Sequence, residues 1–336
     1  MSHTIYDIAR RAGVSIATVS RVFNESAKVS PATREKVLHI AREVGYMPQG
    51  FARGLARRKN NVIMAVVPLL SNYFFLQVLN GIQHTISETD FELHIYNVKP
   101  EEPAFSQVKR LLGRRWADGY LFVSIHLSEG QWQEINQLGQ QMILIDDACT
   151  SCNYFQINNK QGARIATEYF LDRGFSRIAL ITAADRSIPA AKRCEGYYEM
   201  LREYGITPDD PLTARGSTDY RDGFNERNGY EAMLQLLALD EHPEAIVCVS
   251  DIQAIGALSA MKEQQVHIPI IGYDDIQLSE YIGLSTMRQP MYEMGCKGTK
   301  LLLDNLGEES SALVQKNYTP ELILRSTTRA KSNRKD

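Results

Sequence analysis

The first 45 residues place apolar side chains at the spacing of three successive short α-helices. Thr4, Ser15 and Ser30 precede the three segments and can cap a helix start, while Gly13 and Gly45 can end a helix. The apolar positions expected to face a common core are Ile5, Ile8, Ala9, Ala12, Ile16, Val19, Val22, Phe23, Val37, Ile40, Ala41 and Val44. The pattern predicts three helices around a small core, the first two joined as a helix-turn-helix.

From residue 62 the pattern changes to apolar runs of strand length that alternate with helical segments. The runs expected to form strands are 62–68, 91–97, 118–124, 142–146, 177–182, 245–250 and 268–274. Residues 147–161 are more polar and interrupt the alternation. Such alternation is typical of parallel sheets covered by helices on both faces. The predicted fold class is therefore an all-α head followed by an α/β core of two lobes.

Composition and length exclude several classes of protein. The chain has 336 residues, of which 44% are hydrophobic and 23% charged, close to the average of globular proteins. The longest apolar run, residues 62–70, is less than half of the roughly 20 residues that a membrane span needs. The first residues lack the apolar core of a secretory signal. We therefore expect a cytoplasmic protein without a membrane partner.

The charge of the chain is divided unevenly. Residues 1–60 hold eleven Lys and Arg against four Asp and Glu, a net charge of +7, whereas the remainder carries a net charge of −10. A basic head on an acidic body favours a polyanion-binding module fused to a domain with another ligand. The alternative is a helical subdomain with a solvated basic face. The second helix favours DNA, because it offers the major groove small or hydroxyl side chains and one arginine, namely Ser15, Ala17, Thr18, Ser20 and Arg21.

Motifs of common α/β enzymes do not occur in the sequence. No G-x-G-x-x-G follows a predicted strand, and G-x-x-x-x-G-K-[ST], H-E-x-x-H and G-x-S-x-G are missing. Cys149 and Cys152 form a C-x-x-C without a second pair or a nearby His, so we expect loop thiols and no metal. A two-lobed binding core without a cofactor is favoured over an enzyme.

The head resembles the DNA-binding head of the LacI/GalR family of bacterial transcription regulators. The similarity lies in TIYDIARRAGVSIATVSRVFN and SPATREKVLHIAREVGYMPQGFARGLARRK, and it is strongest to the catabolite control proteins. The resemblance implies base contacts from Ile16, Ala17 and Arg21. The whole set of residues predicted to bind DNA is Thr4, Tyr6, Ser15, Ile16, Ala17, Thr18, Ser20, Arg21, Asn24, Ser30, Thr33 and Leu55.

Residues 48–60 resemble the hinge of the same family, which becomes helical on the operator. There, paired leucines from two subunits wedge into the minor groove, and Leu55 is the matching residue. An apolar wedge costs a few kcal/mol of base unstacking, which contacts to the bent DNA recover. Pro48, Gly50 and Gly54 disfavour a helix in the free chain, so we expect folding on binding. Gln49 and Gly50 replace the Asn and Ala that are usual in the family.

The core resembles the family core, whose fold is that of periplasmic sugar-binding proteins. The matching motifs are SNYFFLQVLNGI, DGYLFVS, LIDD, RCEGYYEML, NGYEAMLQLLAL, AIGALSAM, IGYDDI and RQPMYEMG. In that fold the chain crosses between the lobes three times. The predicted domains are a helix-turn-helix in 1–47, a hinge in 48–60, a first lobe in 61–159 plus 290–321, and a second lobe in 160–289 plus 322–336.

The resemblance also implies a small-molecule effector, a sugar or sugar derivative, between the lobes. The implied ligand residues are Asn72, Phe74, Asp146, Arg193, Phe224, Ser250, Asp251 and Asp274. Carboxylates accept hydrogen bonds from hydroxyl groups, and a guanidinium donates hydrogen bonds to hydroxyl oxygens, which suits a polyol. Alternatively, the buried Asp and Arg residues form a structural ion pair and both Phe residues belong to the core. Ser250 and Asp251 replace the Asn-Asp that is usual in the family.

These features predict a homodimeric repressor in the bacterial cytoplasm, associated with the nucleoid. It would bind a pseudopalindromic operator, with a central C-G step implied by the resemblance, and would respond to the effector. No leucine heptad follows ELILRSTTRA, so a dimer is expected rather than a tetramer. A nucleoside or purine effector, or a phosphorylated protein corepressor as in the catabolite control proteins, remains an alternative. A sugar-binding transport or enzyme domain would leave the basic head without a role.

Overall fold

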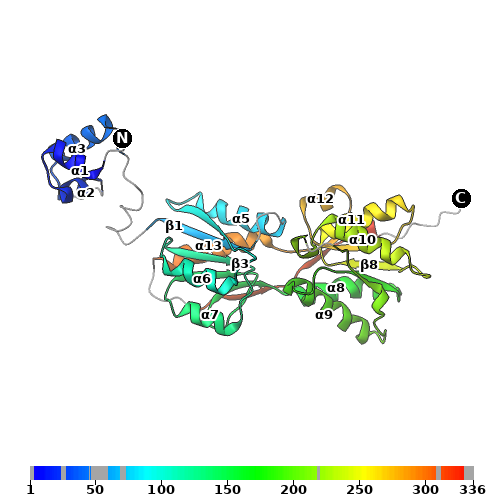
Figure 1. Ribbon diagram of the computed structural model, residues 1–336. Coiled ribbons are helices and arrows are strands. Elements are labelled where there is room, and N and C mark those ends of the chain that lie inside the picture. The colour runs from blue at the N-terminus through cyan, green and yellow to red at the C-terminus, as the bar shows by residue number, and fades with distance from the viewer. Residues whose placement is uncertain are drawn as a thin grey trace.

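A computed structural model describes residues 4–23, 28–44, 46, 60–68, 73–217, 220–307 and 312–328 of the chain. The head consists of the three helices α1 (Ile5–Ala12), α2 (Ile16–Phe23) and α3 (Pro31–Glu43). The first two are joined by a short turn, which confirms the predicted helix-turn-helix. Figure 1 shows these helices as one group and the two lobes of the core as two further groups.

Short polar side chains determine where the head helices begin. The Asp7 carboxylate accepts hydrogen bonds from the Thr4 N–H at 2.9 Å and from the Thr4 hydroxyl at 2.8 Å. The Ser15 hydroxyl accepts one from the Thr18 N–H at 3.1 Å. Gly13 ends α1 with a φ of 66°, in the left-handed region that glycine tolerates. These caps satisfy backbone groups that each helix end leaves without an intrahelical partner.

The head core is small and apolar. Its buried members are Ile8, Ala9, Ala12, Val19, Val22, Val37 and Ala41. The expectation that Ile16 belongs to this core is wrong, because its side chain is 42% exposed. Ile16 is the first residue of α2, whereas the buried residues Val19 and Val22 lie further along the helix. The apolar side chain of Ile16 is therefore available for contact with a binding partner.

The first lobe is built on a six-stranded sheet with the order β11-β5-β4-β3-β1-β2, in which every neighbouring pair is parallel. Its strands are β1 (Val62–Val67), β2 (Glu92–Asn97), β3 (Gly119–Val123), β4 (Gln141–Ile145), β5 (Asn153–Ile157) and β11 (Gln315–Tyr318). Its helices are α5 (Tyr73–Ile86), α6 (Ala104–Gly113), α7 (Glu129–Asn136) and α13 (Met291–Asn305).

Alternate strand residues of this sheet serve two separate cores. In β1, Ile63 and Ala65 pack with α5 and α13, whereas Met64 and Val66 pack with α6 and α7. Successive side chains of a strand point to opposite faces, so a strand that is covered on both sides has no polar face. The continuous apolar run in β1 is therefore explained by burial on both faces.

The second lobe repeats this plan with the sheet order β12-β10-β9-β8-β6-β7, in which only the β10 and β12 pair is antiparallel. Its strands are β6 (Ile178–Ile181), β7 (Thr213–Ala214), β8 (Ala245–Cys248), β9 (Ile270–Asp274), β10 (Ser285–Arg288) and β12 (Glu321–Ile323). Its helices are α8 (Asn159–Leu171), α9 (Ile188–Glu203), α10 (Glu226–Leu237), α11 (Asp251–Glu263) and α12 (Gln277–Tyr281). Helices α8 and α9 cover one face, and α10 and α11 cover the other.

The chain passes between the lobes at three places: from β5 to α8, from β10 to α13, and from β11 to β12. Figure 1 shows α13 along the first lobe although it follows a strand of the second. Asn159 opens α8 and Glu321 opens β12, so both belong to elements of the second lobe. The predicted boundaries after residues 159 and 321 lie within one residue of these element starts, and the division into domains stays a prediction.

Helices α10 and α11 approach each other closely at two glycines. A Cβ atom added to Gly229 would lie 1.9 Å from the backbone oxygen of Gln253. One added to Gly256 would lie 1.9 Å from the backbone oxygen of Glu226. No side chain fits at either position while the helices keep this separation.

Candidate functional site

A cavity of about 430 Å³ lies between the two lobes, where the strands of the first lobe end. Its walls are formed by loops after β3 and β4, by the crossing from β5 to α8 and by the start of α9. The lining residues are His126, Leu127, Asp146, Asp147, Gln156, Ile157, Asn158, Asn159, Lys160, Ile188, Pro189, Lys192 and Asn317. In parallel sheets, ligands bind beyond the carboxyl ends of the strands, and this cavity has that location.

The backbone around the cavity adopts conformations that side chains other than glycine rarely adopt. Ser124 and His126, after β3, have φ angles of 50° and 53°, and Asp146, after β4, has a φ of 56°. In the second lobe, Asp274 and Asp275 at the end of β9 have φ angles of 123° and 56°. Such residues persist only where the surrounding structure holds them, and they concentrate at functional sites. The positive φ angles therefore single out the strand ends as a candidate functional site.

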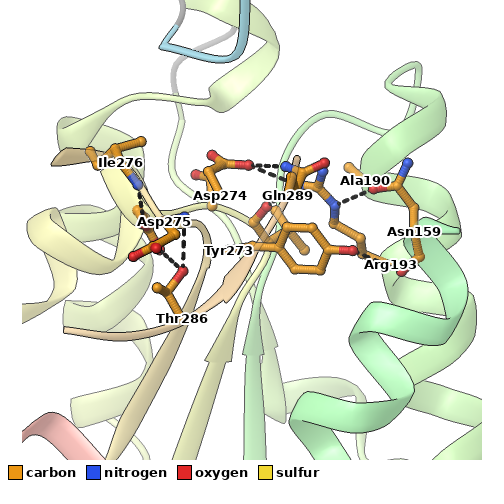
Figure 2. A network of polar contacts seen from close by, with 12 residues as sticks. Asn159, Ala190, Arg193, Tyr273, Asp274, Asp275, Ile276, Thr286 and Gln289 are labelled. Carbon is orange, nitrogen blue, oxygen red and sulfur yellow. Dashed lines mark hydrogen bonds and ion pairs between the residues drawn. The ribbon is translucent and has the colours of Figure 1, made fainter. Parts of the chain in front are cut away.

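Arg193 is the centre of a buried polar network, whose contacts Figure 2 shows. Its Nε donates to the Oδ1 of Asn159 at 2.9 Å, and its Nη1 donates to the backbone oxygen of Val249. The same nitrogen lies 3.7 Å from the Oδ1 of Asp274, and the guanidinium stacks 3.7 Å from the centre of the Tyr273 ring. Because Asn159 lines the cavity, the network ends at its wall.

Asp274 is held in an environment that disfavours its charge. Burial raises the pKa of Asp274 to about 8, although Arg193 and a hydrogen bond from Gln289 oppose this shift. The Nε2 of Gln289 donates to the Oδ1 of Asp274 at 2.5 Å. The Oε1 of Gln289 is buried without a hydrogen-bond partner among the described residues. A buried acceptor without a partner is costly, and a donor from a ligand would remove that cost.

Asp274 gives a prediction for the pH dependence of stability. The pKa of Asp274 is higher in the folded than in the unfolded chain. Between about pH 4 and pH 8 the unfolded chain therefore loses this proton while the folded chain keeps it, and the free energy of unfolding falls as pH rises. We expect Asp274→Asn to gain stability relative to wild type over this range, by up to about 1.4 kcal/mol per pH unit. Urea unfolding of both proteins at pH 5 and pH 7.5 measures the difference. A difference that is the same at the two pH values contradicts the assignment.

On the wall formed by the first lobe, two carboxylates and a histidine face the cavity. Asp146 accepts from the Ser124 hydroxyl at 2.7 Å, and Asp147 accepts from the Trp132 Nε1 at 2.9 Å. Burial raises the pKa of Asp146. The Nδ1 of His126 lies 3.9 Å from Asp147, and although burial alone would lower the pKa of His126, the two carboxylates raise it.

The structure brings some of the predicted effector residues together and places others elsewhere. Asp146 lines the cavity, and Arg193 and Asp274 lie next to it. Phe74 is buried in the core of the first lobe, and Phe224 packs against a core of the second. Asn72 lies outside the described residues.

Ser250 and Asp251 have structural roles rather than the predicted contact with the cavity. Ser250 caps α11 and exchanges hydrogen bonds with Gln253. Asp251 is fully buried and accepts from the hydroxyls of Ser279 at 2.6 Å and Thr286 at 2.5 Å, and from the Ile276 N–H. These donors surround the carboxylate, which thereby links the start of α11 to β10 and to the start of α12.

Sequence reasoning missed several residues of the site. His126 follows a predicted strand, but its role depends on a φ angle that spacing does not reveal. Asn159 and Lys160 lie in the segment that was read as a polar break, and Gln289 lies in the crossing from β10 to α13. Their position at the chain crossings between the lobes could have indicated them, because these crossings border the space between the two sheets.

In the head, the three residues predicted to contact bases lie on the exposed side of α2. Ile16, Ala17 and Arg21 are exposed, whereas Val19 and Val22 on the other side are buried. Of the other predicted contacts, Thr4, Tyr6, Ser15 and Ser30 are exposed and Thr18, Ser20 and Thr33 are partly buried. Asn24 and Leu55 lie outside the described residues. Small side chains around an exposed arginine let α2 approach the floor of a groove.

Comparisons with known proteins agree with this arrangement. The family described as bacterial regulatory proteins, lacI family, matches residues 4–49, and a periplasmic binding protein-like domain matches residues 167–328. The HTH-type transcriptional repressor CytR of Escherichia coli (strain K12) is 32% identical over 97% of this chain and 96% of its own.

Two solved structures are similar along the whole chain. A lac repressor dimer bound to operator and the anti-inducer ONPF is 26% identical, with a TM-score of 0.79 over 98% of this chain and 100% of the other. A complex of the transcriptional regulator CelR with cellobiose is also 26% identical, with a TM-score of 0.66 over 97% of this chain and 99% of the other.

The chain belongs to the LacI family of bacterial regulatory proteins. It is a DNA-binding transcription regulator, and its relatives are regulators rather than enzymes. Among the described residues, no helix is both long and apolar enough to cross a lipid bilayer. Cys149 and Cys152 are buried free thiols. The cytoplasmic and nucleoid location stays a prediction.

Proposed function

We propose that this regulator is a repressor that binds a pseudopalindromic operator as a homodimer and changes its affinity when a small molecule occupies the cavity between the lobes. The observation that carries the proposal is the combination of two surfaces in one chain. One is the exposed side of α2, with Ala17 and Arg21, on a basic head. The other is a polar cavity at the strand ends of a two-lobed core.

The DNA half of the proposal is supported by the chemistry of α2. Arg21 provides the planar fork of donors that reads guanine, and Ile16 offers an exposed apolar surface to a thymine methyl group. A dimer would present two such helices, so the two halves of its operator would be related by symmetry. The lac repressor structure that this chain resembles is itself a dimer on an operator.

The effector half is supported by the polar groups at the cavity. Asp146, Asn159 and the network of Arg193 provide both acceptors and donors, which suits a ligand with several hydroxyl groups. The similar lac repressor and CelR structures hold ONPF and cellobiose, respectively. A sugar or sugar derivative is therefore the proposed effector. Control by a phosphorylated protein corepressor stays a prediction from the resemblance.

The cavity can act on DNA binding through the relative positions of the lobes. Its walls come from both lobes, so a ligand that bridges them favours one arrangement over the other. The change in operator affinity is limited by the difference between the ligand's affinities for the two arrangements. Whether the ligand releases or strengthens DNA binding depends on which arrangement the operator-bound dimer adopts.

Selection from a library of random double-stranded DNA tests the proposal without a known operator. The full chain is incubated with the library at physiological salt, and bound sequences are amplified through successive rounds. We expect one enriched site with two-fold symmetry, whose affinity falls steeply as salt rises. Enrichment of no sequence, or of an asymmetric site bound by a single chain, contradicts the proposal.

A further inference from the structure

The ionisable groups around the cavity leave no surplus of positive charge among the described residues, and this balance limits what the cavity binds. We infer that the cavity takes an uncharged polyhydroxyl ligand, such as a free sugar or a nucleoside, and rejects the phosphate ester of the same compound. The inference rests on the proposed function, because it specifies the effector of that site.

Both lysines that line the cavity are paired with carboxylates. The Nζ of Lys160 lies 3.0 Å from Glu195 and 2.5 Å from Glu199, and the Nζ of Lys192 lies 2.9 Å from Glu195. The glutamates thus neutralise the two lysines, which could otherwise form ion pairs with a phosphate group. The pairs link α8 and α9 along one wall of the cavity.

This row of charges continues away from the cavity. Arg164, one turn further along α8, lies 3.4 Å from Glu199 and 2.6 Å from Glu203. Three bases therefore alternate with three acids from Lys192 to Glu203, and the row is neutral as a whole. Glu203 does not line the cavity and pairs with Arg164 rather than with a lysine of the wall.

The opposite wall repels anions. Asp146 and Asp147 line it, with His126 as the cation beside them. Arg193 lies behind Asn159, and its positive charge acts on Asp146, whose pKa it lowers against the effect of burial. A phosphate in a cavity of this size would come close to a carboxylate at low dielectric, which is unfavourable. A hydroxyl group would instead donate to the same oxygens.

The two helices that begin at the cavity each use one of their first amide groups in a cap. The N–H groups near a helix start attract anions only where they are free. Asn158 caps α8 by accepting from the Gln161 N–H at 3.0 Å. Ser187 caps α9 by accepting from the Ala190 N–H at 3.4 Å, and Pro189 has no N–H. Uncharged amide side chains from Gln156, Asn159 and Asn317 complete the lining and suit hydroxyl groups.

Freeing the lysines tests the charge balance without a known effector. Inorganic phosphate is titrated against wild type, Glu195→Gln/Glu199→Gln and the matched control Glu203→Gln, with chloride at equal ionic strength as the reference. We expect the double variant to bind phosphate at least about tenfold more tightly than wild type, and the control to behave like wild type. If the double variant binds phosphate no more tightly than wild type does, the inference is overturned.

A bacterial metabolite extract tests the ligand class directly. It is divided on ion exchangers into an uncharged and an anionic fraction, and each is tested for a rise in melting temperature and for a change in binding to the selected operator. The four common ribonucleosides with their 5′-monophosphates, and ribose with ribose 5-phosphate, are tested as matched pairs. Wild type should respond to the uncharged fraction alone, and Asp146→Asn should lose that response.

The remaining outcomes separate the two proposals. A response to the anionic fraction, alone or together with the uncharged one, overturns the inference but leaves control by an effector intact. A response to neither fraction overturns effector control itself, and the ligand class with it. Symmetric operator selection would survive either result, because it depends on the head.

Discussion

Arg21→Ala should abolish most of the sequence-specific DNA binding of the protein. Arg21 is exposed on α2, where its guanidinium can reach base edges. One such contact contributes about 1–3 kcal/mol, and a dimer has two, so we expect affinity for the selected site to fall roughly 30-fold or more. Fluorescence anisotropy with the selected site and with a scrambled duplex measures the effect.

Arg42→Ala is the matched control for this experiment. Arg42 is an exposed arginine of the same head, near the end of α3, and its Nε donates to the backbone oxygen of Leu38. It is outside the predicted DNA-binding set, so we expect only the small loss that follows from one less positive charge. Equal losses in the two variants, or an equal loss on both duplexes, would show that Arg21 provides charge and not sequence reading.

Gly229→Ala should strongly destabilise the second lobe. A Cβ atom at this position would lie 1.9 Å from the backbone oxygen of Gln253, so α10 and α11 would have to separate. Gln253 is buried, and its Nε2 donates to the backbone oxygen of Thr182 at 2.8 Å and to Asn228 at 3.0 Å. We expect a loss of about 3 kcal/mol or more in unfolding free energy, measured in urea.

Gly130→Ala provides the comparison. Gly130 is also helical, in α7, and an added Cβ would meet no atom within 4 Å. Alanine favours a helix over glycine by up to about 1 kcal/mol, so this variant should be slightly more stable than wild type. A loss at Gly229 no larger than the change at Gly130 would mean that the helices can separate without cost.

The regular parts of the fold were predictable because their signals are local. Residues 62–67 are apolar throughout because β1 is covered on both faces, and Ser15 and Gly13 bound head helices through caps that depend on neighbours in sequence. Strands β5, β7, β10, β11 and β12 were missed. They are short, and their pairing joins segments far apart in the chain, such as Tyr154 with Gln315.

The site was predicted only in part, for a similar reason. Asp146, Arg193 and Asp274 follow from resemblance and lie in or beside the cavity. Asp251 looked equivalent in sequence, but donors from β10 and α12 surround its carboxylate. Whether a polar residue at a strand end binds a ligand or stabilises the fold depends on what the rest of the chain places around it.

The most direct test of the account measures operator affinity in the presence and absence of the uncharged metabolite fraction. The full chain is titrated onto the selected symmetric site, as wild type and as Asp146→Asn. We expect the fraction to change the affinity of wild type at least about fivefold, the lower end of typical allosteric coupling, and to leave Asp146→Asn unchanged. An affinity that is the same with and without both metabolite fractions, for a protein that binds its operator specifically, would contradict the link between cavity and DNA.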